Sequence, residues 1–138
     1  MKFLRKIAVI TLAMALLVQP LSNTKSQAAN DGISTQADNV AGMSITLDID
    51  TDGATRCIAY IIGEPGTSRI AGTMKLKKVT SSGTTTVKSW DISRTGDELK
   101  VSKTCYILSK GTYRLEIKVK VTRNGYTETV SGSRTSTY

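Results

Sequence analysis

Apolar and polar residues alternate along most of the chain from Gly42 onward, which is the pattern of β-strands with one buried face. The clearest run covers residues 113–122, where five apolar residues alternate with charged residues and a threonine. Glycine-containing turn signals separate this run from others like it. We predict seven strands, at residues 43–50, 54–62, 70–76, 84–92, 99–107, 113–122 and 126–136.

Three local features refine this prediction. Residues 54–62 are apolar on both faces, which is typical of a strand in the middle of a sheet. The apolar members of the fourth strand, Val87, Trp90 and Ile92, have mixed parity and indicate a bulge. Asn124-Gly125 favours a type I′ hairpin. Since no helical period follows residue 28, the fold class is all-β, with two antiparallel sheets packed face to face as a sandwich.

The first 28 residues have the pattern of a secretory signal peptide. Basic residues precede an apolar run of 12 residues at 7–18, and Ser26-Gln27-Ala28 offers small residues for cleavage after Ala28. The run is too short to span a bilayer. The sequence therefore predicts export, to the medium or to a periplasm, and no membrane span.

The rest of the chain divides into a short leader and one domain. Residues 29–41 are mostly small and polar, so we expect a flexible leader. Residues 42–138 suffice for a single immunoglobulin-like β-sandwich and not for two domains.

Charge is uneven along the chain, whose net charge is +8. Residues 67–138 hold fourteen bases and five acids. A basic surface attracts nucleic acid, anionic lipid or acidic cell-wall polymers, although lysine on outward strand positions also serves solubility. Nucleic acid is an unlikely partner because aromatic residues, which stack bases, make up only 5% of the chain.

The chain has no histidine, which excludes His-dependent triads and imidazole acid–base catalysis. The carboxylates that follow the second predicted strand fall in turns or on outward strand positions, where solvent keeps them ionised. They are Glu64, Asp91, Asp97, Glu98, Glu116 and Glu128. We therefore expect neither an enzyme nor a cofactor.

Asp48, Asp50 and Asp52-Gly53 match the first half of an EF-hand calcium loop. Position 12 of such a loop needs a bidentate acid, and here it is Ala59. We expect a solvated strand and turn, and a weak calcium site of another kind is the alternative.

Cys57 and Cys105 are the only cysteines. In an exported protein such a pair predicts a disulfide, and two separate buried thiols are the alternative.

Seven strands, and Leu108-x-x-Gly111-x-Tyr113 just before the longest of them, resemble an immunoglobulin or fibronectin type III sandwich. The resemblance implies that the Tyr113 hydroxyl hydrogen-bonds back to the backbone, forming a tyrosine corner. Two positions depart from the antibody pattern, since Leu115 replaces the second bridging cysteine and Trp90 comes late.

A second resemblance covers nearly the whole chain. Met74-x-Leu76-x-Lys78, Val87-Lys88-Ser89-Trp90, Gly111-Thr112-Tyr113-Arg114 and the Ser/Thr-rich final strand resemble an uncharacterised family of small secreted proteins of Gram-positive anaerobes. The resemblance implies an exported sandwich and no chemistry.

These patterns favour a secreted, non-enzymatic binding or structural module that contacts a cell-surface polymer or another exported protein. The alternative is a domain that binds carbohydrate or an anionic cell-wall polymer. A carbohydrate site would use exposed aromatic side chains as flat platforms, although the same side chains also suit the core. The candidates are Trp90, Tyr60, Tyr106 and Tyr126.

Overall fold

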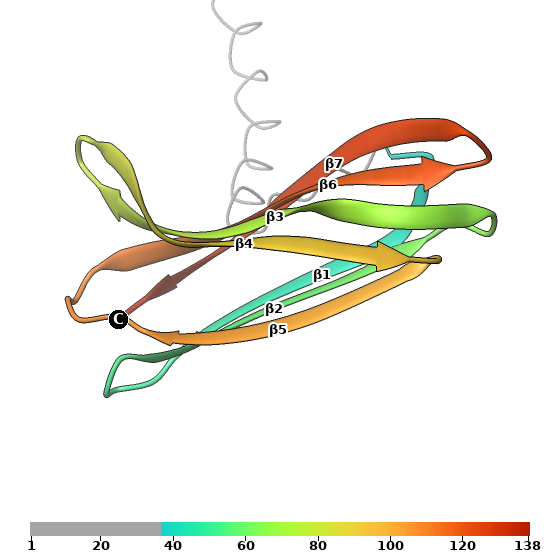
Figure 1. Cartoon of the computed structure of the whole chain (residues 1–138). Helices are drawn as coiled ribbons and strands as arrows, with labels where there is room; N and C mark the ends of the chain where they lie inside the picture. The colour runs from blue at the N-terminus through green and yellow to red at the C-terminus, as the bar shows by residue number, and fades with distance from the viewer. Residues whose placement is uncertain (1–36) are drawn as a thin grey trace, which may run out of the picture.

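The computed structural model describes residues 37–138 as two antiparallel sheets packed face to face (Figure 1). The expected signal peptide at residues 1–28 and most of the expected leader lie outside the described residues. The seven strands are β1 (Val40–Ile49), β2 (Ala54–Gly63), β3 (Thr67–Thr80), β4 (Gly83–Thr95), β5 (Glu98–Tyr106), β6 (Thr112–Arg123) and β7 (Tyr126–Thr137).

The strand order is β1-β2-β5 in one sheet and β4-β3-β6-β7 in the other. The all-β class and the central place of the doubly apolar strand β2 are thus confirmed. β3 and β4 are longer than expected, because their hairpin continues through a polar stretch that carries no alternating pattern. No helix in residues 37–138 is long and apolar enough to cross a membrane.

The core lies between the sheets and is built from the alternating residues predicted to face inward. β6 contributes its complete apolar set, each at most 2% exposed: Tyr113, Leu115, Ile117, Val119 and Val121. Ile70, Met74 and Leu76 of β3 lie beside them. The period-2 pattern therefore assigned the faces of β3 and β6 correctly.

The expected bulge and hairpin are both present. Leu76 lies opposite Lys88 and Lys77 opposite Thr86, so Val87 has no partner in β3. The bulge leaves Val87 40% exposed. At the β6–β7 turn, Asn124 has φ 51° and Gly125 has φ 80°, as a type I′ turn requires.

Asp38 and Asn39, which precede β1, are hydrogen-bonded to β7. The two carboxylate oxygens of Glu128 accept hydrogen bonds from the backbone amides of Asp38 (3.1 Å) and Asn39 (2.8 Å). The Asn39 side chain, 2% exposed, donates to the carbonyls of Val121 and Tyr126. Asp38 and Asn39, which were expected to belong to the leader, are therefore held against β6 and β7. The outward position expected for Glu128 is also wrong, since it lies opposite buried Val121.

Candidate functional site

The outer face of the four-stranded sheet is strongly basic. Outward residues of β3 and β6 lie side by side because these strands are paired in the middle of the sheet. We call its six bases the basic strip: Arg69, Lys75, Lys77, Arg114, Lys118 and Lys120. Only two acids, Asp91 and Glu116, share this face within the described strands.

Two of the six bases of the basic strip lie beside a carboxylate, and in the described residues the other four do not. Lys77 lies directly opposite Arg114, a repulsive arrangement that Glu116 relieves. Glu116 is 2.9 Å from the Lys77 ammonium and 3.9 Å from the Arg114 guanidinium. Within residues 37–138, no carboxylate lies at ion-pair distance from Lys75, Lys118 or Lys120.

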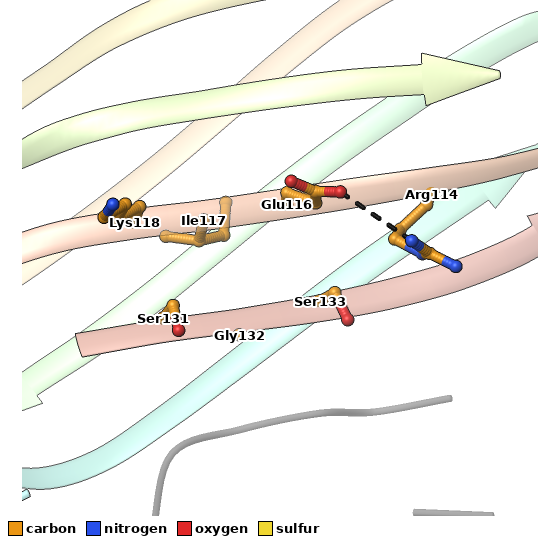
Figure 2. A pocket seen from close by; sticks show the side chains of 7 residues that line it. All are labelled: Arg114, Glu116, Ile117, Lys118, Ser131, Gly132 and Ser133. Atoms are coloured by element: carbon orange, nitrogen blue, oxygen red, sulfur yellow. Dashed lines mark ion pairs between the residues drawn. The ribbon is translucent and has the colours of Figure 1, made fainter. Parts of the chain in front are cut away.

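Two shallow depressions mark the strip. One, of about 250 Å³, lies between β6 and β7, where Arg114, Glu116 and Lys118 stand beside the short side chains of Ser131 and Ser133 (Figure 2). The other, of about 160 Å³, lies above Gly72 of β3 and is also lined by Lys118. Lys118 therefore lines both depressions.

A row of hydroxyl groups on β7 borders the two depressions. Every outward position of edge strand β7 is serine or threonine: Thr127, Thr129, Ser131, Ser133, Thr135 and Thr137. Hydroxyls both donate and accept hydrogen bonds, so the row complements the cations beside it without adding charge.

The outer face of the three-stranded sheet differs in charge. Its two bases, Arg56 and Lys100, are matched by Asp48 and Glu98. Arg56 contacts Asp48 at 2.9 Å. Basic character is therefore confined to one of the two faces.

The four aromatic candidates do not form one platform. Trp90 lies opposite Met74 on the inner side of edge strand β4 and is half-buried against the core. Tyr60 lies midway along the outer face of β2, and a hydrogen bond with Glu98 raises the pKa of its hydroxyl. Tyr106 (70% exposed) and Tyr126 (62% exposed) lie at opposite ends of the domain.

Two of the three aspartates of the calcium candidate have separate hydrogen-bond partners. Asp48 pairs with Arg56, and an Asp52 side-chain oxygen accepts the Ala54 amide at 3.0 Å in the β1–β2 turn. Among the described residues, no group of three or more potential metal ligands converges.

Cys57 and Cys105 are free thiols, so the expected disulfide is not formed in this structure. β2 and β5 are neighbours, but Cys57 lies opposite Lys103 while Cys105 lies opposite Thr55. Burial raises the pKa of Cys57 to about 12, and the nearby Cys105 adds to the increase. Burial also raises the pKa of Cys105, against a smaller opposing effect of Lys88.

Tyr113 has a structural role. Its buried hydroxyl donates to the Ser109 carbonyl at 2.7 Å, the backbone hydrogen bond implied by the sandwich resemblance. The Lys78 ammonium lies 5.9 Å from the centre of its ring.

Comparison of the chain with known protein families and with curated proteins finds no match. The basic surface described above is therefore the main indication of function. The sequence alone shows these bases only as a count, because they come together on one face only when residues 69–77 pair with residues 114–122.

Proposed function

We propose that this protein is an exported, non-enzymatic binding module that holds an anionic polymer along the basic strip. The observation that carries the proposal is the concentration of six bases on one sheet face, with three lysines lacking carboxylate partners in the described chain. The sequence pattern of residues 1–28 supports the export part of the proposal.

Clustered like charges repel one another and destabilise the fold, and a polymer with regularly placed phosphate or carboxylate groups offsets that repulsion. Bases placed only for solubility have no reason to gather on one face while the other face stays balanced. Arg114, Lys118 and Lys120 line the two depressions, so one polymer that lies across both contacts several cations at once. Each contact after the first is then intramolecular, which raises the apparent affinity.

The test measures the affinity of the purified protein for polyphosphate and for polygalacturonate at two salt concentrations. Replacing Lys75, Lys118 and Lys120 by serine is expected to weaken binding and to lower the slope of log affinity against log salt by about 2, at roughly 0.7 per lost contact.

The matched control replaces Arg94, Lys100 and Lys103, three exposed bases outside the strip, by serine and changes the net charge equally. It is expected to retain most of the affinity. Equal losses in the two triple variants, or no binding at low salt, would contradict the proposal. Preference for one of the two polymers identifies phosphate or carboxylate as the anionic group.

A further inference from the structure

We propose a second, independent ligand site that takes a neutral sugar ring stacked on Tyr106. The site is a depression of about 300 Å³ at one end of the three-stranded sheet, on the sheet opposite the basic strip. It is lined by Asp48, Asp50, Ala54, Arg56, Thr104 and Tyr106.

The depression is present because Ala54, a small residue, lies among larger side chains. Ala54 lies opposite Tyr106 on β5, and its carbonyl accepts the amide of Asp50 on the other side. One row further along, Arg56 lies between Asp48 and Thr104. The Ala54 methyl group is therefore the floor, and an aromatic ring, two carboxylates and a guanidinium stand around it.

The side chains around this floor suit a polyhydroxyl ring. Tyr106 is 70% exposed and offers an apolar ring face with a polar tip. The Asp50 carboxylate has no hydrogen-bonded side-chain partner among the described residues and can accept hydrogen bonds. Arg56 has donors beyond its one bond to Asp48, and the Thr104 hydroxyl can both donate and accept. A sugar hydroxyl also donates and accepts, so this mixed set satisfies it.

The charges around the floor select against an anion. Asp48 and Asp50 carry two negative charges, and Arg56 offsets only one of them. The ion pair between Arg56 and Asp48 is exposed to solvent, so it contributes little to the stability of the local fold. With anions disfavoured, the exposed Tyr106 ring and the mixed hydrogen-bond donors and acceptors are the features that favour a neutral sugar ring.

The test titrates the ¹⁵N-labelled purified protein with cellohexaose, maltohexaose and chitohexaose, at up to roughly 10 mM because weak single-site binding has millimolar dissociation constants. At least one sugar is expected to shift the amide signals of Ala54, Arg56 and Thr104 in a saturable way. Tyr106→Ala is expected to weaken that binding by about tenfold, through loss of the aromatic contact. Ala54→Leu, which fills the floor, is expected to abolish it.

Tyr126→Ala is the matched control, since Tyr126 is 62% exposed and lies at the other end of the domain. It is expected to leave sugar binding unchanged. The proposal is overturned if none of the three sugars shifts these signals, or if Tyr106→Ala and Tyr126→Ala bind the sugar equally. Neither result bears on polyanion binding, because the two sites lie on different sheets.

Discussion

Cys57 and Cys105 share the inner face of adjacent strands, but they are two residues out of register. Such diagonal neighbours are farther apart than a disulfide permits. Lys103 occupies the place opposite Cys57 that a bridging cysteine would need.

Thiol labelling tests this arrangement. Without reductant, Cys105 is expected to react with iodoacetamide in the folded protein faster than fully buried Cys57, because access and thiolate fraction control the rate. After denaturation, still without reductant, mass spectrometry is expected to show two adducts. Recovery of linked cysteine peptides and no adduct would restore the disulfide expected from the sequence.

Alkaline pH is expected to destabilise the fold through Cys57. Its pKa is about 12 in the folded protein, above the 9.0 of an unperturbed thiol. The unfolded state therefore loses its proton first, so stability is complete below pH 9 and falls between about pH 9 and pH 12, by up to about 1.4 kcal/mol per pH unit. Urea unfolding at several pH values measures this slope. Cys57→Ala is expected to have a smaller slope, and an unchanged slope would contradict the prediction.

Tyr113→Phe is expected to lower the free energy of unfolding by about 1 kcal/mol, because it leaves the Ser109 carbonyl without its hydrogen bond. A loss of that size lowers the melting temperature by roughly 4–8 °C in a domain of this size. Tyr126→Phe, at an exposed position, is the control and is expected to change nothing. Equal melting temperatures for both variants would show that the corner does not stabilise the domain.

Ile117→Asp is expected to prevent folding, because Ile117 is 1% exposed and the new charge would have no partner in the core. Lys118, one residue further along, is exposed to solvent, so Lys118→Asp is expected to keep the strand signal in circular dichroism. Similar damage from both changes would mean that the faces of β6 are assigned wrongly.

Glu128→Gln is expected to destabilise the start of the domain by about 1 kcal/mol, because an amide offers one acceptor oxygen where the carboxylate offers two. Faster hydrogen exchange at the amides of Asp38 and Asn39 is the direct measurement. Asp91→Asn makes the same chemical change on an exposed position and is expected to leave this exchange unaltered. Unchanged exchange in Glu128→Gln would show that other contacts hold these residues.

Strand positions, turn chemistry and the inner faces were predictable because each depends on residues close together in the sequence. The alternation in residues 113–122 defined β6, and Asn124-Gly125 defined its hairpin. The bulge was visible as mixed parity, but which residue it would expel was not. The register of β4 on β3 shows that the unpaired residue is Val87.

The candidate surfaces depend on contacts between distant parts of the chain, which a local pattern does not encode. Lys75 and Lys118 gather on one face only because β3 pairs with β6. Tyr106 was named as a platform, but its neighbours Ala54 and Asp50 follow from the pairing of β5 with β2 and of β2 with β1. Glu128 was misassigned for a related reason, since its partners lie 89 and 90 residues away.

The hydrogen bonds that hold Asn39 have a mechanical consequence. Asn39 is fixed at the β6–β7 turn, whereas Tyr138 is bonded to Gly111 at the far end of the sandwich (Figure 1). Tension between these two points acts along β1 and β7. The ladder hydrogen bonds of antiparallel strands lie perpendicular to that direction, so they share the load together and do not open one after another. A pulling force applied between these two points therefore loads the sandwich along its length.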